Sequence, residues 1–479
     1  MKSKLSVIFS LLLLLPIALF ATGQQDGGDE AGDESLSKMK GIFDRILTEE
    51  NGQKEWGDAF EALTGTEIEI IKPVHNQYSQ ILGATFAAGD LPDIVEIQTN
   101  DYLAYAKSGN LVPLEAYLEN SDAFKAVDPA LLEAYRLKDG HIYGVPTYNG
   151  GGCVTYIRKD WLDNLGLDVP TTWDEYYNVL KAFTLNDPDG NGKNDTMGLT
   201  LPFQTGYEFD YYNRFIMQKA MFGFQFKNGK WVDGFLQPEM VGALERFNKL
   251  YKEGFLDNEF FTNKTSTARS KIYEGQAGVM EYWSGTWAVR FNDSAQNSNP
   301  AAEVISIAPI NDAFYINRVG PAFSITKAAK NPEAVFDVFL NTMLDKGDGQ
   351  TLFTHGIEGK HYEVVNGKYS MLPEPANPDR PFDKAYSDPT LVMNGWETLV
   401  PLTDLITLSR TIHKANSVQL SLPQGGDTYI KRIGELLTLK QEIFAEAVIG
   451  TISPEGALAQ YKAKAQNLEL DTILMELNQ

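Results

Sequence analysis

Strands and helices alternate along the first part of the folded chain. Residues 66–72 are rich in isoleucine and alternate apolar with charged side chains, which is typical of a strand. Residues 76–88 carry apolar side chains at helical spacing and end at Gly89, and a short strand at 93–97 and a short helix at 101–108 follow. Because a strand–helix–strand–helix order builds a parallel sheet with crossover helices, we predict an α/β fold.

The same alternation returns after residue 150. The sequence predicts strands at 154–158, 277–282, 303–307 and 323–326, and helices at 172–181, 238–251, 267–273 and 331–344. Residues 356–401 are predicted to be irregular, and the chain from Tyr429 onward is predicted to be helical. Between the two parts, Asn149 and a run of three glycines favour a hinge, because glycine tolerates large backbone rotations. A phosphate-binding loop is the weaker alternative, since no GxGxxG pattern is present.

The first residues have the pattern of a targeting segment. Lys2 and Lys4 precede an apolar run at 5–20, and small residues follow at 21–23. We therefore predict a signal peptide at 1–23 and a flexible, acidic, glycine-rich leader at 24–35. A transmembrane anchor is the alternative, but the run is shorter than the ~20 residues needed to span a membrane and contains Pro16. No cysteine follows the run, so we expect a released periplasmic or extracellular protein without a lipoprotein cysteine.

Charge and cysteine content exclude several classes of protein. The 479 residues carry a formal net charge of −23, which disfavours binding to nucleic acid. The same charge argues against polyanionic sugars as ligands unless local cations offset it. The chain has one cysteine, Cys153, so it forms no intrachain disulfide and no cysteine-based metal cluster, and we expect this thiol to be buried.

Several motifs in one order resemble the extracellular solute-binding proteins of ABC importers, in the family that binds carbohydrates. They lie at residues 91–95 (LPDIV), 144–148 (GVPTY), 156–162 (YIRKDWL), 165–175 (LGLDVPTTWDE), 275–287 (GQAGVMEYWSGTW) and 331–334 (NPEA). The chain is most similar to the long subgroup of oligosaccharide and polysaccharide binders that carry a calcium loop. One departure is that residues 40–48 make a poor first strand, which leaves the first ligand-contacting loop, near Glu49, unassigned.

This resemblance implies a two-lobed periplasmic-binding-protein fold of the type II kind, with hinge-connected lobes and a ligand cleft between them. We predict that lobe one holds residues 36–147 and 311–345. Lobe two then holds residues 148–310 and 346–479.

An acidic loop after the predicted helix at 172–181 has the spacing of a calcium-binding loop. Oxygen-bearing side chains fall at loop positions 1, 3, 5 and 9, a glycine stands at position 6, and position 7 offers its backbone carbonyl. Position 12 is Gly198, and Thr196 stands where the family's loop closes with an acidic residue, so we expect weakened affinity. A plain Asp/Asn/Gly turn is the alternative. The predicted ligands of this structural Ca²⁺ are Asp187, Asp189, Asn191, Lys193 and Asp195.

Aromatic and polar residues at predicted strand ends are the candidates for a sugar site. Aromatic rings stack on the apolar faces of sugars, and carboxylates and amides bind the hydroxyl groups. Most aromatic residues must belong to the core, so each candidate is open between a cleft role and packing, with Trp287 favoured. The candidates are Asn100, Asp101, Tyr148, Asn149, Tyr211, Glu281, Trp283, Trp287 and Trp396.

The resemblance implies a monomeric binding protein that captures a carbohydrate by closing its lobes and delivers it to an ABC permease, with no bond made or broken. One alternative is a secreted glycoside hydrolase, for which Glu281 and Asp210 would be the paired carboxylates. Nothing in the sequence marks them as a pair, and no HExxH or GxSxG motif occurs. A polysaccharide-binding surface protein is the other alternative.

Overall fold

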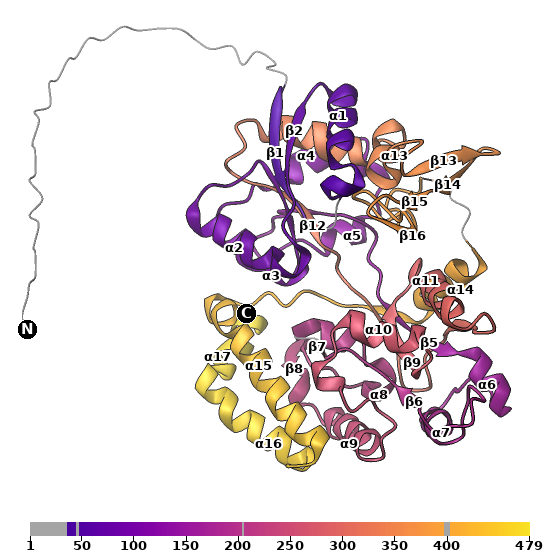
Figure 1. Cartoon of the computed structure of the whole chain (residues 1–479). Helices are drawn as coiled ribbons and strands as arrows, with labels where there is room; N and C mark the ends of the chain where they lie inside the picture. Colours follow the sequence, from indigo (N-terminus) through magenta and orange to yellow (C-terminus); the bar gives the residue numbers. More distant parts are fainter. Residues whose placement is uncertain (1–35, 45–46, 204–205, 397–402) are drawn as a thin grey trace, which may run out of the picture. The chain divides into compact units, whose positions relative to one another are not determined.

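The computed structural model describes residues 36–44, 47–203, 206–396 and 403–479 (Figure 1). The predicted signal peptide and leader lie outside the described residues and stay predictions. In the part of the chain that is described, no helix combines the length and the apolar character needed to cross a membrane.

A five-stranded sheet with the order β2-β1-β3-β12-β4 forms the centre of the first lobe. Strand β1 pairs in parallel with β2 and β3, which confirms the parallel sheet, and β12 runs antiparallel between β3 and β4. Strand β1, which lies between β2 and β3, begins before the stretch at 40–48 that makes a poor strand in the sequence, and it ends within that stretch. The strands are β1 Lys38–Ile42, β2 Glu67–Ile71, β3 Ile94–Ile97, β4 Val145–Pro146 and β12 Ala322–Ile325.

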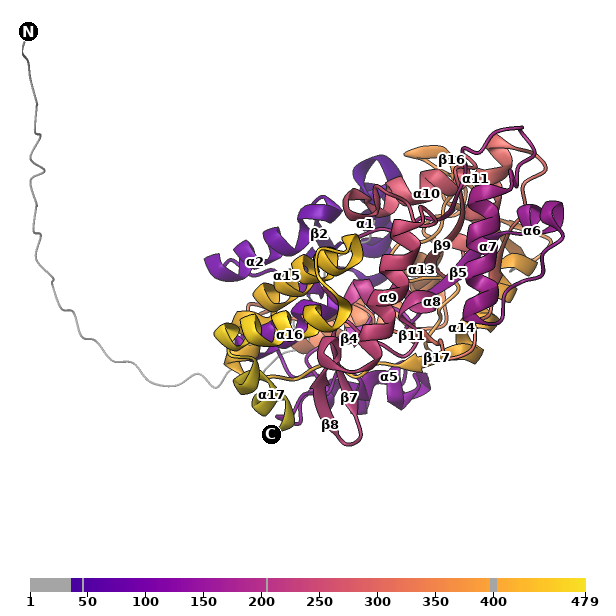
Figure 2. The same ribbon diagram turned by 90° about the horizontal axis from the view of Figure 1, so that it is seen from below.

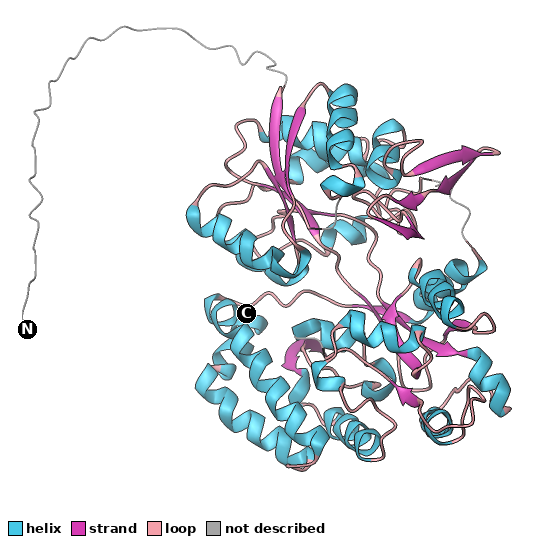
Figure 3. Ribbon diagram, viewed as in Figure 1, coloured by secondary structure: helices cyan, strands magenta, loops and turns pink. Residues whose placement is uncertain are grey.

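Short amphipathic helices connect the strands of this first sheet (Figure 3). Helix α1 buries Trp56 and Phe60, and α2 ends at Gly89 in the left-handed conformation, as the sequence predicts. The predicted helix at 331–344 is only partly α-helical, because α12 continues into a π-helical segment, Phe336–Asn341. The helices are α1 Gln53–Thr64, α2 Tyr78–Ala88, α3 Thr99–Lys107, α4 Glu115–Asn120, α5 Pro129–Glu133 and α12 Pro332–Val335.

A four-stranded sheet with the order β10-β5-β9-β6 forms the centre of the second lobe. Its middle strands β5 and β9 are antiparallel and almost wholly buried. Gly278 in β9 has no space for a side chain, since a Cβ there would meet the Phe183 ring at 2.1 Å. The strands are β5 Cys153–Arg158, β6 Met197–Leu199, β9 Ala277–Trp283 and β10 Val304–Ile307, and Cys153 is buried as expected.

Helices surround the second sheet, and those predicted at 172–181, 238–251 and 267–273 begin within two residues of their predicted starts. At the start of α7, Thr172 and Glu175 form a capping box, in which each side chain binds the backbone of the other residue. The helices of this part are α6 Lys159–Leu165, α7 Trp173–Leu185, α8 Arg214–Met217, α9 Glu239–Lys252, α10 Thr265–Tyr273, α11 Trp287–Ser298 and α14 Asp404–Asn416.

The C-terminal helices pack on the second lobe. Helix α15 (Asp427–Ile449) lies along α9 and α16 (Pro454–Ala465), as Figures 1 and 2 show, and α17 (Leu470–Asn478) follows. Lys440 of α15 is fully buried and pairs with Asp233 at 2.7 Å, and Tyr461 of α16 donates to the same carboxylate. Asp233 ends β8 (Lys230–Asp233), the partner of β7 (Phe224–Lys227), so this buried charge pair fixes the helices to the lobe.

The region predicted to be irregular contains two hairpins. Strand β13 (Tyr362–Val365) pairs with β14 (Lys368–Met371), and β15 (Pro373–Glu374) pairs with β16 (Asn377–Pro381). The prediction of wholly irregular structure at 356–401 was therefore wrong for these strands. The side chains of β13 are largely exposed and those of β14 are mostly half-buried, so these two strands lack the apolar alternation that marks a strand in the sequence.

Two segments pack on the lobe opposite to the one predicted for them. Helix α13 (Asp348–His355) packs on the first lobe, where the Trp56 indole donates to the Leu352 carbonyl at 3.0 Å. Strand β11 (Tyr315–Asn317) belongs with the second sheet, because the Tyr315 hydroxyl binds the backbone of Thr155 and Ile307 and β11 pairs with β17 (Ser417–Gln419). Residues 348–355 were thus assigned to the wrong lobe, and so were residues 315–317.

Candidate functional site

Polar side chains from both lobes line a cavity of about 230 Å³. The first lobe contributes residues that follow β1 and β3, together with residues near the start of α2 and α3. The second lobe contributes the 3₁₀ segment Gly206–Tyr211, and Arg318 lies where the chain passes between the lobes. The lining residues are Asp44, His75, Tyr78, Ser79, Gln98, Thr99, Asn100, Asp101, Glu208, Tyr211 and Arg318.

Topology explains why the first-lobe residues gather here. The carboxyl ends of neighbouring parallel strands meet at one edge of a sheet, so the residues after β1 and β3 come together. The Asp44 carboxylate lies 2.8 Å from Nδ1 of His75 and accepts a hydrogen bond from the Gln98 side chain at 2.8 Å. The backbone N–H of Asp44 donates to Glu96, so this carboxylate is held rigidly at the wall of the cavity.

Arg318 joins this cavity to a second one. Its guanidinium lies 4.2 Å from the centre of the Trp283 ring and donates to the Tyr148 hydroxyl. Its backbone N–H donates to the Gly151 carbonyl at 3.0 Å, which ties the residue to the glycine run. Sequence reasoning missed Arg318, since nothing in the local sequence shows that residues 148, 283 and 318 meet.

The second cavity, of about 80 Å³, lies against the glycine run. At Gly152 a Cβ would meet the Ile316 carbonyl oxygen at 1.9 Å, so close approach of two crossing segments requires this glycine. The predicted hinge role of residues 149–152 stays a prediction. The cavity is lined by Tyr148, Gly150, Gly151, Gly152, Trp283, Ser284, Thr286, Trp287, Arg318, Asp383, Lys384, Asp388 and Leu391.

Two of the three candidate tryptophans, Trp283 and Trp287, line this cavity and differ in what already covers them. The guanidinium groups of Arg269 and Arg290 both lie over the Trp287 ring, each 4.7 Å from its centre, and Tyr282 packs edge-on against it. Trp283 is half-buried, with Arg318 over its ring and tyrosines at its edges. The geometry therefore favours Trp283 over Trp287 as a stacking surface, contrary to the expectation from the sequence.

Glu281 lies in the core of the second lobe and not at either cavity. Its two carboxylate oxygens accept hydrogen bonds from the backbone N–H groups of Arg214 and Phe215, at 2.7 and 2.9 Å. Burial raises the pKa of Glu281 to about 7. The carboxylate caps the start of α8, and this placement argues against direct contact with a ligand.

Trp396 and Asn149 are not among the residues that line the two cavities. Trp396 packs near the buried ring of His355, with the ring centres 5.9 Å apart. The Asn149 side chain is exposed, and its backbone N–H donates to the Leu391 carbonyl at 2.8 Å. By contrast, the candidates Asn100, Asp101, Tyr148, Tyr211 and Trp283 all line a cavity.

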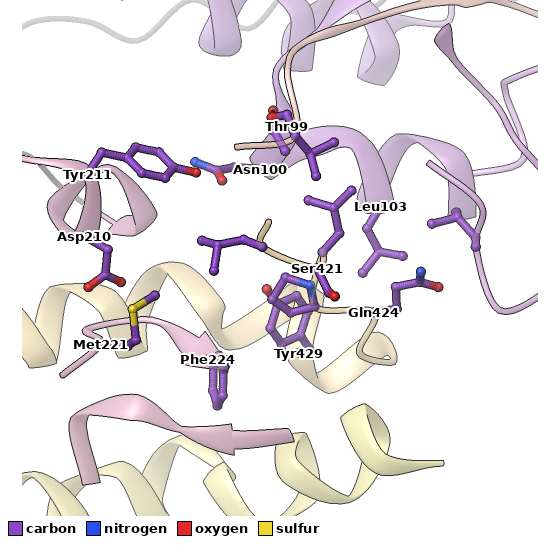
Figure 4. Close-up of a pocket in the computed structure, with 15 residues that line it drawn as sticks. Thr99, Asn100, Leu103, Asp210, Tyr211, Met221, Phe224, Ser421, Gln424 and Tyr429 are labelled. Atoms are coloured by element: carbon purple, nitrogen blue, oxygen red, sulfur yellow. Dashed lines mark hydrogen bonds between the residues drawn. The ribbon is translucent and has the colours of Figure 1, made fainter. Parts of the chain in front are cut away.

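A smaller pocket of about 50 Å³ adjoins the first cavity and is mainly apolar. Figure 4 shows Tyr211 directed toward Asn100, and Met221, Phe224 and Tyr429 on the second-lobe side. Residues 420–424 form part of its wall and are held to the first lobe, where the Gln424 side chain binds the backbone of Lys138 and Arg136. The pocket extends the polar cavity with a surface suited to apolar groups.

The predicted calcium loop folds as a hydrogen-bonded turn. Asp187 accepts from the backbone N–H groups of Asn191 and Gly192, and the Asn191 amide donates to Asp189 and Asp195 at 2.9 and 3.1 Å. The Lys193 N–H donates to the Asn191 side chain, and the Thr196 hydroxyl donates to the Phe183 carbonyl. Within the described ranges, no group of three or more His, Cys, Asp or Glu side chains is arranged to hold a metal.

Comparison with known proteins identifies the family. The family model for bacterial extracellular solute-binding proteins matches residues 47–350, which is more than half of the chain. The chain belongs to this family. Membership in an extracellular family implies that the solute-binding protein is exported.

Relatives and solved structures agree with this assignment. The lipoprotein LipO of Bacillus subtilis is 29% identical over 66% of this chain, and the match spans 65% of LipO. The polygalacturonan/rhamnogalacturonan-binding protein YtcQ of Bacillus subtilis is 26% identical over 84% of this chain and 81% of its own. The fold is that of the alginate-binding protein AlgQ2 crystallised without calcium, with a TM-score of 0.70, 20% identity, and coverage of 93% of this chain and 98% of AlgQ2.

Proposed function

We propose that this solute-binding protein captures a carbohydrate in the cavity around Arg318 and delivers it to the permease of an ABC importer. The observation that carries the proposal is the meeting of an aromatic surface with hydroxyl-binding groups. The Trp283 ring, under the Arg318 guanidinium, lines the second cavity, and the carboxylates of Asp101 and Glu208 line the first cavity, which Arg318 also lines. Aromatic rings cover the C–H faces of a sugar, while carboxylates accept hydrogen bonds from its hydroxyl groups.

The printed names of relatives support a carbohydrate. YtcQ is named for polygalacturonan and rhamnogalacturonan, and FusA of Streptococcus pneumoniae, 26% identical over 49% of this chain, is named as the substrate-binding protein of a fructooligosaccharide ABC transporter. Both of these relatives are named as binding proteins. We infer that two lobes close around the sugar and that no covalent step occurs.

A hydrolase is less well supported. Its nominated carboxylates, Asp210 and Glu281, are each 1% exposed. Asp210 accepts from the backbone N–H groups of Phe222 and Gly223, and Glu281 caps α8. Carboxylates engaged in this way hold the backbone and are poorly placed to protonate or attack a glycosidic bond.

A sugar screen tests the proposal. We expect at least one oligosaccharide in a panel of neutral and acidic sugars to raise the melting temperature by several degrees and to be recovered unchanged after incubation, with binding measured by calorimetry. Peptides of similar size serve as the control. A panel in which no sugar changes the melting temperature contradicts the binding function, and the appearance of shorter sugars supports the hydrolase.

We further propose that the loop at 187–195 binds Ca²⁺ in a structural role. The side chains of Asp187, Asp189, Asn191 and Asp195 bring oxygen atoms to one turn, as a hard cation requires. Burial and the neighbouring Asp187 raise the pKa of Asp189, and a cation would offset this repulsion. Solved neighbours include AlgQ2 described without its calcium ion and an EF-hand mutant of FusA.

Chelation tests the calcium proposal. We expect 1 mM Ca²⁺ to raise the melting temperature by a few degrees over that in EDTA, and Asp189→Asn to remove the difference. Asp122→Asn is the matched control, because its side chain is 93% exposed in another part of the chain. Equal melting temperatures with Ca²⁺ and with EDTA contradict the proposal.

A further inference from the structure

We propose that the cavity of Asp44, Asp101 and Glu208 selects an uncharged sugar and rejects a uronate, that is, a sugar carrying carboxylates. The inference rests on the proposed function and narrows the class of ligand. It also departs from the acidic polysaccharides for which YtcQ and AlgQ2 are named.

Negative charge dominates the wall of this cavity. Three carboxylates line this cavity, whereas the basic side chains among its described lining residues are those of Arg318 and His75. His75 is already paired with Asp44 at 2.8 Å. An anionic ligand would therefore meet more repulsion than attraction at this wall.

Arg318 is poorly placed to bind a sugar carboxylate. The residue is 7% exposed. Its guanidinium lies over the Trp283 ring and donates to the Tyr148 hydroxyl. Recognition of a carboxylate by arginine uses a fork of two free N–H donors pointing at the ligand. Here one of the donors already binds the Tyr148 hydroxyl, so we infer that Arg318 packs on the Trp283 ring and orients Tyr148 instead of binding a carboxylate.

The second cavity is less negative than the first. Lys384, Arg318, Asp383 and Asp388 line it, and Asp383 is paired with Arg290 at 2.8 Å, which leaves Lys384 and Arg318 against Asp388. The selection against a uronate is therefore assigned to the first cavity, where Asp101 and Glu208 line the wall.

Hydrogen bonding points the same way as charge. An ionised carboxylate only accepts, so Asp101 and Glu208 require donors on the ligand, and sugar hydroxyls are donors. A uronate replaces one hydroxymethyl donor with a pure acceptor. Burial raises the pKa of Asp101, so its charge is already costly in the cavity and a second anion would add to that cost.

Matched sugar pairs test the selection. Calorimetry would compare neutral oligosaccharides with their uronate counterparts of the same linkage and length, in the gluco, galacto and manno series. We expect the neutral member to bind at least tenfold more tightly in each series that binds, and the ratio to fall as salt rises from 0.05 to 0.5 M.

Two charge-neutralising variants sharpen the test. Asp101→Asn and Glu208→Gln should narrow the neutral-to-uronate ratio several-fold, while Asp122→Asn, which removes an exposed charge elsewhere, should leave it unchanged. Uronates that bind as tightly as the neutral sugars overturn this inference and leave the sugar-binding function standing. Binding of no sugar in either set overturns the proposed function, and this inference with it.

Discussion

Exchanging Glu281 for glutamine is expected to remove a pH-dependent loss of stability of about 3 kcal/mol. In the folded protein burial raises the pKa of this carboxyl to about 7, from an ordinary value of 4.5. Between these two pH values the unfolded chain has already released the proton that the folded chain still holds. The free energy of unfolding of the native protein therefore falls as pH rises from about 4.5 to 7, by about 3 kcal/mol in all.

The surroundings of Glu281 account for this shift. Its carboxylate interacts with the buried guanidinium of Arg214, and with the hydroxyls of Tyr176 and Tyr315 and the Cys153 thiol, which are buried as well. Burial removes water from the carboxylate, which disfavours the charged form more strongly than two backbone N–H donors and the Arg214 guanidinium favour it. Glutamine has the same shape and carries no charge at any pH, so it isolates the titration from the packing.

Urea unfolding at pH 5 and pH 8 measures the effect. The difference in unfolding free energy between the native protein and Glu281→Gln should change by about 2.5 kcal/mol between these pH values, with the native protein losing stability at the higher pH. The control is Glu274→Gln, an exposed glutamate just before β9, for which the gap should not depend on pH. A gap for Glu281→Gln that is equal at both pH values contradicts a raised pKa.

Local patterns sufficed for six strands of the two central sheets, β2, β3, β5, β9, β10 and β12, and for helices such as α2 and α7. The capping box of Thr172 and Glu175, the glycine after α2, and the apolar run in β9 each lie within a few residues and act through local geometry. Strand β1 was not predicted, and residues 40–48 were judged a poor strand, because the apolar character of Lys38–Ile42 is diluted by lysines and by Gly41. That glycine serves packing, since a Cβ there would meet the Phe43 ring at 2.3 Å, and such a reason is invisible in the sequence.

The candidate site was predicted where it follows strand ends and missed where it depends on distant segments. Asn100 and Asp101 could be chosen because they follow β3, and Trp283 because it ends β9. Arg318 and Asp44 reach the same cavity only through the meeting of separate segments. The local sequence pattern around each of these residues does not show which distant segment it will contact.

Glu281 illustrates a different limit. It stands two residues before Trp283 on the same strand, so both side chains lie on one face of β9. Alternation therefore gives the two residues the same prediction. Depth separates them: Glu281 lies under α8 and is 1% exposed, whereas Trp283 ends the strand and lines a cavity.

Trp283→Ala is expected to weaken the binding of whichever sugar the screen identifies by about 100-fold. The substitution removes a half-buried indole that lines the second cavity and supports Arg318, whose guanidinium is 4.2 Å from the ring centre. Burying an aromatic side chain is worth roughly 1.5–3 kcal/mol, and a cation over the ring adds about 0.5–2 kcal/mol. A loss of about 2.7 kcal/mol corresponds to the expected 100-fold change in Kd.

Trp287→Ala is the matched comparison, because it removes an indole from the same cavity four residues away. Two arginines already lie over that ring, so a sugar gains little from it, and we expect a change in Kd of less than about fivefold. Melting temperatures of the unliganded variants control for damage to the fold. A larger loss in Trp287→Ala than in Trp283→Ala contradicts the assignment of the stacking surface.

Trp283→Phe separates stacking from the support of Arg318. Phenylalanine keeps an aromatic face for the sugar but offers the guanidinium a weaker π surface than indole. If stacking on the sugar dominates, the phenylalanine variant should recover most of the affinity lost in Trp283→Ala. If the ring acts chiefly by holding Arg318, Arg318→Lys should weaken binding as much as Trp283→Ala does, because lysine lacks the planar group that lies over the indole.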